Sequence, residues 1–233
     1  MVSLHSAAGA PPRRSSLVDG AYEALKRAIR NNVFAPGYQG SEGEIAAQLG
    51  MSRTPVHEAI IRLQEEGLVR VLPRRGVQVC AISPEDMREI YEVIIALETA
   101  SAELIAAMPP ERRTRTADEL DALNARMEEA LAGEDLVAWA EADGRFHQLL
   151  VERSGNRRLA RMFHTIMDQS HRARMLTLRL RPKPGRSLRD HRGIVEAIRL
   201  GEAPAARDRA KAHRARARDE LLPLIDALGM RHL

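Results

Sequence analysis

The sequence predicts a mainly α-helical protein of two domains, in which an N-terminal winged helix-turn-helix precedes a C-terminal all-helical bundle. Three observations support this fold class. Apolar residues recur at helical spacing along most of the chain. The strand signals are confined to two short β-branched runs around a Pro-Arg-Arg-Gly turn. The length of 233 residues suits two domains, because a single core typically serves about 100–150 residues.

Composition limits the classes of partner and the compartment. The formal net charge is only +4, so contact with nucleic acid requires a local basic patch. Aromatic residues make up 3%, which disfavours the stacking platforms that bind single strands. The single cysteine, Cys80, excludes an intramolecular disulfide and fits a reducing compartment. No apolar run reaches the roughly 20 residues of a membrane span, and residues 1–16 lack a signal-peptide core, so we expect a cytoplasmic protein without a membrane partner.

The N-terminal domain is expected at residues 16–80, after a flexible tail at residues 1–15. Ser41 and Glu44 match a capping box at the start of the second helix. Gly50 supplies the following turn, and Pro55 stands at the tolerated first position of the third helix. Two β-branched runs then predict a hairpin. The predicted helices lie at 16–32, 41–49 and 52–66, and the predicted strands lie at 68–72 and 77–79.

The C-terminal domain is expected at residues 83–229, where strand signals disappear and six helices are predicted. Ser83 caps the first of these helices, with a proline in its first turn. Thr116 and Glu119 match a further capping box and therefore predict a helix start. Residues 181–186 hold two prolines and a glycine, which predict a loop.

Several side chains in the first domain are candidates for contact with double-stranded DNA. In a helix-turn-helix the second of the two motif helices enters the major groove, and its first turn meets the base edges. Arginines at the hairpin tip can bind phosphates or enter a minor groove. A glycine there can adopt the positive φ that a tight tip needs. These charges could instead be ordinary solvated side chains of a small helical domain. The candidates are Arg53, Thr54, His57, Arg62, Arg74, Arg75 and Gly76.

Four residues of the second domain are candidate metal ligands. Asp143 and His147 are four residues apart and share one face of a predicted helix, while His191 and His213 come from two later helices. Three imidazoles and one carboxylate suit a divalent ion, with Zn²⁺ favoured and Ni²⁺, Mn²⁺ or Fe²⁺ as alternatives. Each residue taken alone is more typical of a surface or hydrogen-bonded position.

The first domain resembles the DNA-binding domain of the GntR family of bacterial repressors. Residues 41–69 read SEGEIAAQLGMSRTPVHEAIIRLQEEGLV, and residues 73–77 read PRRGV, which is similar to the wing of that family. The resemblance spans about residues 17–80 and implies binding to operator DNA. The family commonly places DNA-contacting arginines where this chain has Gly43 and His57, so operator sequence or affinity is expected to differ from the family norm. His57 retains a donor for a base or phosphate.

Residues 83–223 resemble the all-helical FCD effector domain of the FadR subfamily. Asp143-Gly-Arg-Phe-His147, followed by His191 and His213, fits the ligand spacing of its metal-binding members. The resemblance implies an ion beneath an effector pocket. Many members carry an arginine on the first helix of this domain, where this chain has Ile94 after Tyr91-Glu-Val. Tyr91 and Ile94 are therefore candidate pocket residues, and a more apolar acid, lipid-like or aromatic, is admitted as effector; Ile94 as plain core is an equal alternative.

These observations together predict a homodimeric transcription regulator and not an enzyme. A two-fold operator requires two recognition helices, and the default is a repressor whose operator affinity changes when a small carboxylate-bearing effector binds. In one alternative the metal itself is the signal. In another the chain is a metal-dependent hydrolase, although it lacks a His-Glu-x-x-His motif, a nucleophile elbow and a phosphate-binding glycine loop.

Overall fold

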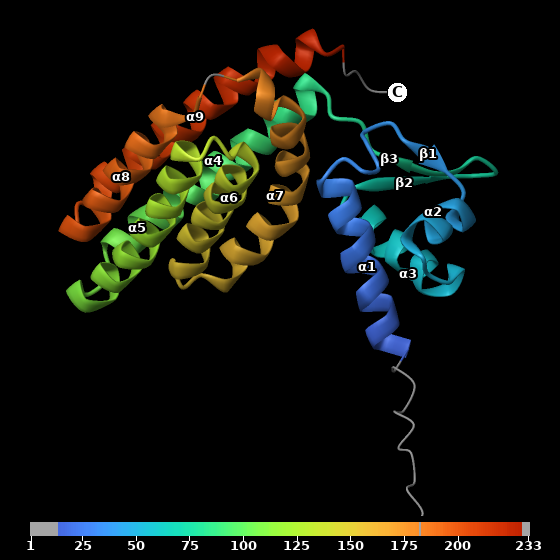
Figure 1. Ribbon diagram of the computed structural model, residues 1–233. Coiled ribbons are helices and arrows are strands. Elements are labelled where there is room, and N and C mark those ends of the chain that lie inside the picture. The colour runs from blue at the N-terminus through green and yellow to red at the C-terminus, as the bar shows by residue number, and fades with distance from the viewer. Residues whose placement is uncertain (1–13, 182, 230–233) are drawn as a thin grey trace, which may run out of the picture. The chain divides into compact units, whose positions relative to one another are not determined.

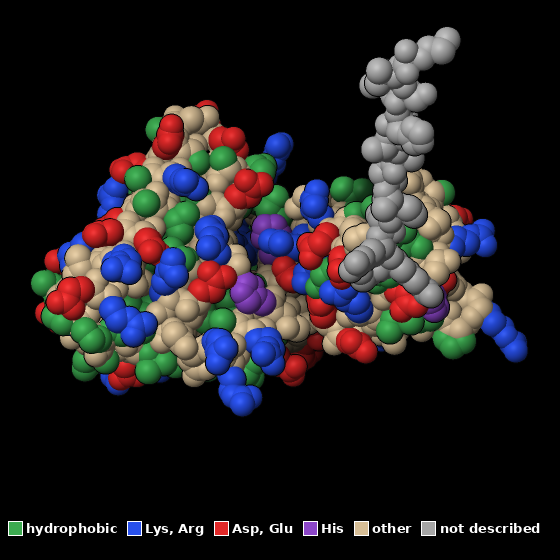
Figure 2. Space-filling view, turned by 90° about the horizontal axis from the view of Figure 1, so that it is seen from below, with side chains coloured by type: hydrophobic (Ala, Val, Ile, Leu, Met, Phe, Trp, Pro, Cys, Tyr) green, Lys and Arg blue, Asp and Glu red, His purple; other side chains and the backbone are tan. Residues whose placement is uncertain are grey.

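The computed structural model describes residues 14–181 and 183–229, and the chain divides into two compact units at residues 1–80 and 81–233. Within the described ranges no helix is both long and apolar enough to cross a membrane. Figure 2 shows Lys and Arg side chains interspersed with Asp and Glu over the face in view, consistent with a net charge of only +4.

The first unit combines three helices with a small antiparallel sheet (Figure 1). The sheet has the order β1-β3-β2, and Val69 pairs with Val79 across the hairpin. The extra strand β1 was not predicted, because two residues carry no periodicity; its Gln39 pairs with Gln78. The bounds are α1 Arg14–Arg30, β1 Gln39–Gly40, α2 Glu42–Leu49, α3 Arg53–Glu65, β2 Val69–Leu72 and β3 Gly76–Val79.

Local chemistry explains where these elements begin and end. The predicted capping box forms, since Ser41 Oγ accepts from the Glu44 amide at 3.2 Å and the Glu44 carboxylate accepts from the Ser41 amide at 2.7 Å. Gly50 ends α2 at φ 66°. Pro55 occupies the third position of α3, not the first, but still lies in the first turn, where an amide has no partner within the helix. Helix α1 begins two residues inside the predicted tail, whose residues 1–13 lie outside the described part of the chain.

The second unit consists of six α-helices and one 3-10 turn within the described residues (Figure 1). Helix α4 packs along α9 and also contacts α6, α7 and α8, so it forms the centre of the bundle. Two apolar clusters fill the interior, one around Tyr91 and Phe163 and one around Phe146 and Leu120. The bounds are α4 Pro84–Ala106, α5 Pro110–Ala132, α6 Leu136–Arg153, α7 Arg157–Thr177, η1 Leu178–Leu180, α8 Gly185–Leu200 and α9 Ala203–Ala227.

The helix start predicted at Thr116 is wrong. Helix α5 begins at Pro110, whose fixed φ suits the first position of a helix, and it continues through Thr116 without a break. The Thr116 hydroxyl donates to the carbonyl of Arg112 at 3.1 Å, so a residue that resembles a cap bonds to the preceding turn of the same helix.

The two serines that precede α2 and α3 offer a matched test of capping. Ser41→Ala removes a side-chain cap and should lower the free energy of unfolding of the first unit by about 1 kcal/mol. Ser52 makes no capping side-chain bond, so Ser52→Ala should cost clearly less. Native-state hydrogen exchange of core amides in the full chain measures both changes. Equal losses from the two variants would contradict this account of the α2 start.

Candidate functional site

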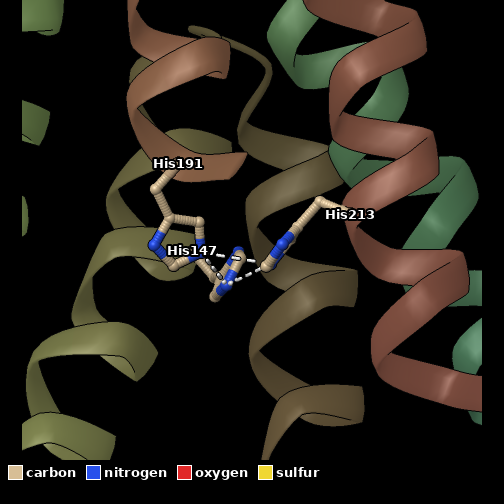
Figure 3. Close-up of side chains that lie close together, drawn as sticks. All are labelled: His147, His191 and His213. Carbon is tan, nitrogen blue, oxygen red and sulfur yellow. Dashed lines mark hydrogen bonds between the residues drawn. The ribbon is translucent and has the colours of Figure 1, made fainter. Parts of the chain in front are cut away.

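Three histidine side chains from three helices meet inside the second unit (Figure 3). His147 lies on α6, His191 on α8 and His213 on α9, and all three are buried. Their Nε2 atoms are 3.2 Å apart for His147 and His191, 3.1 Å for His191 and His213, and 3.4 Å for His147 and His213. This three-histidine cluster is the group of possible metal ligands found among the described residues.

The spacing of these three nitrogens fits a common metal ion. Three nitrogens bound tetrahedrally at about 2.0–2.1 Å from Zn²⁺ stand about 3.3–3.4 Å apart, close to the observed separations. His147 Nδ1 lies 2.9 Å from Glu98 Oε2. An ionised carboxylate only accepts, so Nδ1 carries the proton and the Nε2 lone pair of His147 faces the cluster. The cluster therefore has the geometry and the tautomer that a bound ion requires.

Burial also favours the neutral, ligating form of two of the rings. Burial, together with the charges of His213 and His147, holds the pKa of His191 well below its ordinary value. Burial lowers the pKa of His213 to about 4, against a hydrogen bond to Asp190 that acts in the opposite direction. Both imidazoles are therefore neutral near pH 7, with lone pairs available.

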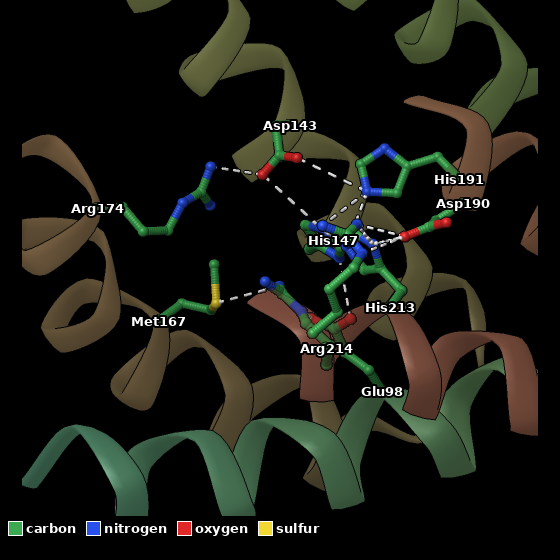
Figure 4. Close-up of polar contacts among 10 residues, drawn as sticks. Glu98, Asp143, His147, Met167, Arg174, Asp190, His191, His213 and Arg214 are labelled. Atoms are coloured by element: carbon green, nitrogen blue, oxygen red, sulfur yellow. Dashed lines mark hydrogen bonds and ion pairs between the residues drawn. The ribbon is translucent and has the colours of Figure 1, made fainter. Parts of the chain in front are cut away.

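Asp143, the fourth predicted ligand, lies at the edge of the cluster and is shared with a cation (Figure 4). Its Oδ2 is 3.7 Å from His147 Nε2, and its Oδ1 is 3.7 Å from His191 Nε2. The same Oδ2 accepts from Arg174 on α7 at 2.5 Å. Burial alone would raise the pKa of Asp143, but the Arg174 guanidinium and the neighbouring His147 outweigh burial and hold that pKa well below its ordinary value. Asp143 is therefore an ionised carboxylate beside two of the three imidazoles.

A second layer of charged residues supports the rings. Glu98 on α4 accepts from Arg214 Nε at 2.9 Å as well as from His147. Burial alone would raise the pKa of Glu98, but Arg214 and His147 outweigh it and lower the pKa to about 2. Asp190 on α8 lies 3.4 Å from His213 Nδ1 and pairs with Arg216.

Sequence reasoning missed these supporting residues. Glu98 stands four residues after Ile94 and seven after Tyr91, on the apolar stripe of α4, so a charge at that position was a detectable signal. Arg174 and Asp190 gave none, because many charged residues occur on their helices.

A cavity of about 170 Å³ adjoins the cluster, since His213 and Asp143 both line it. Tyr91, one of the two predicted pocket residues, also lines it. Ile94 is fully buried in the apolar cluster of Tyr91 and Phe163 and is not among the lining residues. The position at which the resemblance led us to look for an arginine is thus occupied by a core residue in this chain.

The predicted DNA-contacting side chains fall into two groups: some are exposed to solvent, and others bond to neighbouring side chains. Arg53, Thr54, Arg74 and Arg75 are exposed, and the hairpin tip has positive φ at Arg74 and at Gly76, where φ is 90°. A side chain at Gly76 would collide with the Gly40 carbonyl oxygen. The tip therefore holds its two arginines on a turn that the backbone fixes.

Two other candidates are engaged within the first unit. His57 Nδ1 lies 2.9 Å from Glu42 Oε1, and this bond raises the pKa of His57. Arg62 binds Asp19 at 2.8 Å and lies 3.9 Å over the Tyr22 ring, so it joins α3 to α1. The Arg53 guanidinium occupies the space that a side chain at Gly43 would need.

Exposed cations on a helix-turn-helix with a wing, followed by a helical domain whose cavity adjoins buried histidines, are typical of DNA-binding regulators that respond to ligands. Residues 17–79 match the family model described as bacterial regulatory proteins of the gntR family, and residues 89–216 match the FCD domain. The chain belongs to the GntR family and carries an FCD domain.

Individual relatives agree with this assignment. A helix-turn-helix-type transcriptional regulator in the TAR-I ttuE-ttuC' intergenic region of Agrobacterium vitis is 51% identical over 148 residues, covering 64% of this chain and 86% of the relative. The helix-turn-helix-type transcriptional repressor RspR of Escherichia coli K12 is 29% identical, covering 79% of each chain. A solved GntR transcriptional regulator from Rhodococcus sp. RHA1 is 25% identical with a TM-score of 0.71, covering 89% of this chain and 98% of that one.

Two glutamates test how much the buried layer contributes to stability. Glu98→Gln leaves Arg214 with no charged partner in the interior and should lower the free energy of unfolding by about 3–5 kcal/mol. Glu128 pairs with Arg192 at the surface, so Glu128→Gln should cost about 0–1 kcal/mol. Urea unfolding followed by the fluorescence of Trp139, the sole tryptophan, measures both. Similar losses would show that the buried pair is not a structural requirement.

Proposed function

We propose that this GntR-family regulator is a homodimeric repressor whose affinity for double-stranded operator DNA is set by a small-molecule effector bound beside a divalent metal. The observation that carries the proposal is the cavity that His213 and Asp143 line, because a small molecule held there would lie beside the possible metal ligands. The repressor direction is supported by the relative named RspR, a transcriptional repressor.

The metal is proposed to be held by His147, His191 and His213, with Asp143 as a fourth ligand. Nitrogen ligands without a thiolate suit Zn²⁺ first, and also Ni²⁺, Mn²⁺ or Fe²⁺. When bound, the ion would supply a positive charge that attracts an acidic group of the effector. Glu98 would keep its hydrogen bond to His147 and so orient that ring, as carboxylates do behind metal-bound imidazoles.

DNA contact is proposed for the start of α3 and the hairpin tip. Arg53 and Thr54 would meet base edges, while Arg74 and Arg75 would meet phosphates or a minor groove. A two-fold operator places half-sites about 34–36 Å apart, which requires two copies of the first unit and therefore a dimer. An effector changes operator affinity only if it favours one arrangement of the paired DNA-binding units.

Arginine substitution tests the DNA surface. With an operator selected from random duplex DNA, Arg53→Ala should weaken binding by about 5- to 150-fold, as expected for loss of one base contact. Arg88 lies on α4 in the second unit and is exposed, so Arg88→Ala should leave affinity unchanged. Fluorescence anisotropy at one fixed salt concentration measures both. An Arg53→Ala protein with native affinity would remove α3 from the proposed interface.

Metal content tests the cluster. Full-length protein dialysed against Zn²⁺ should retain about one ion per chain, and zinc should raise its melting temperature. His191→Ala should abolish both effects. His164→Ala is the matched control, because His164 is half exposed and its ring lies 3.3 Å from Glu152, away from the cluster. Elemental analysis and thermal unfolding provide the readouts. Zinc retained by His191→Ala would place the ion elsewhere.

A further inference from the structure

We propose that the cavity takes a small organic acid with two anionic groups, recognised by Tyr91, Trp139, Arg174 and Arg181. This inference rests on the proposed function, because it assumes that the cavity beside the three-histidine cluster is the effector site. The inference adds the chemical class of the effector and the residues that bind the effector.

Three buried polar atoms on the walls of this cavity lack a hydrogen-bond partner within the described residues. They are Tyr91 Oη, Trp139 Nε1 and Arg174 Nη1, and all three side chains belong to residues more than nine-tenths buried. Buried polar groups are almost always hydrogen-bonded in native proteins. An indole N–H and a guanidinium only donate, and a phenol also donates, so the missing partner is rich in acceptors. Carboxylate and hydroxyl oxygens satisfy that requirement.

The charges around the cavity indicate an anion. Most of the basic lining residues have acidic partners: Asp143 binds Arg174, Glu98 binds Arg214, Asp190 and Glu220 bind Arg216, and Glu134 binds Lys183. Arg181 and Arg186 have no carboxylate partner among the described residues. The six basic residues that line the cavity are Arg174, Arg181, Lys183, Arg186, Arg214 and Arg216.

Of the two arginines without a carboxylate partner, Arg181 is better placed to bind an anion in the cavity. It donates from Nε at 3.1 Å and from Nη2 at 2.8 Å to the Thr177 hydroxyl, which fixes the guanidinium without neutralising it. Burial lowers the pKa of Arg181, and the neighbouring charge of Arg174 acts in the same direction. Arg181 and Arg186 thus leave two positive charges without a carboxylate partner among the described lining residues, and two such charges attract a dianion more strongly than a monoanion.

The donors also lie at two depths. Arg174 is buried next to Asp143 and the histidines, whereas Arg186 is exposed at the start of α8. An acid with one anionic group at each end fits this arrangement. The cavity has a volume of about 170 Å³. Pockets that bind drug-sized ligands typically measure about 300–1,000 Å³, so this cavity is too small for a lipid chain. The sequence allowed an apolar acid as effector because Ile94 stands where many relatives carry an arginine. That class is disfavoured, because Arg174 on α7 and Arg181 after η1 supply cations from another part of the domain.

Calorimetric titration of the zinc-loaded full-length protein tests this assignment. The dianionic probes are succinate and L-malate. The matched controls are butyrate, with one carboxylate, succinamide, with none, and decanoate, with an apolar chain. We expect binding of at least one dianionic probe, at least tenfold tighter than each control.

Variants then test the residues. Tyr91→Phe removes a hydroxyl that has no partner, so it should leave the melting temperature of the free protein unchanged or raised while weakening probe binding about tenfold. Arg181→Gln should weaken binding of the dianion more than binding of butyrate. Arg192→Gln is the control, because Arg192 pairs with Glu128 at the surface outside the cavity. A purely structural role for Tyr91 would lower the melting temperature and leave affinity unchanged.

The remaining outcomes separate this inference from the proposed function. Absence of binding by both dianionic probes, or tighter binding of decanoate or succinamide, would overturn the ligand class. If decanoate or succinamide also shifted operator affinity, effector control would stand without this class. A dianion that binds in a Tyr91-dependent manner, yet leaves operator affinity unchanged, would support the ligand class and count against effector control.

Discussion

The second unit depends on the neutralisation of charge in a dry interior. Glu98 and Arg214 retain only 1% and 2% of their side-chain exposure, and removal of two such charges from water is costly unless each is paired. The same carboxylate binds His147, so the ion pair between α4 and α9 also orients a ring of the three-histidine cluster. Helix packing and site geometry therefore rest on one set of contacts.

Because of this dependence, the same residues serve both the packing of the helices and the candidate metal site. Asp143 bonds to Arg174 and stands 3.7 Å from two of the imidazoles, so its charge serves both the α6–α7 contact and the candidate metal position. The cavity lies where this network is incomplete: Arg174 uses one of its nitrogens on Asp143 and leaves another without a partner. In a well-packed protein such a gap marks a place for another molecule more readily than a defect.

Periodicity and capping predicted both domains and nearly all of their helices, because these signals are local. Prediction failed where a local signal had two meanings, as at Thr116, whose hydroxyl bonds within its own helix. The histidines were grouped by their spacing and by resemblance, and the structure brings their rings together, whereas metal ligation stays a prediction. Glu98 was detectable as a charge on an apolar stripe. Its pairing with Arg214 was not, because residues 116 apart in the sequence meet only through the tertiary fold.

The spacing of the three histidines along the chain has a further consequence for folding. They are separated by 44 and 22 residues, so the meeting of their rings closes two long loops. A chain with Cys80 as its sole cysteine has no intramolecular disulfide to restrain such loops. An ion shared by the three rings would act as a removable crosslink, with an entropic benefit that grows with the length of the loops it closes. Chelation would then loosen the bundle as reduction loosens a secreted protein.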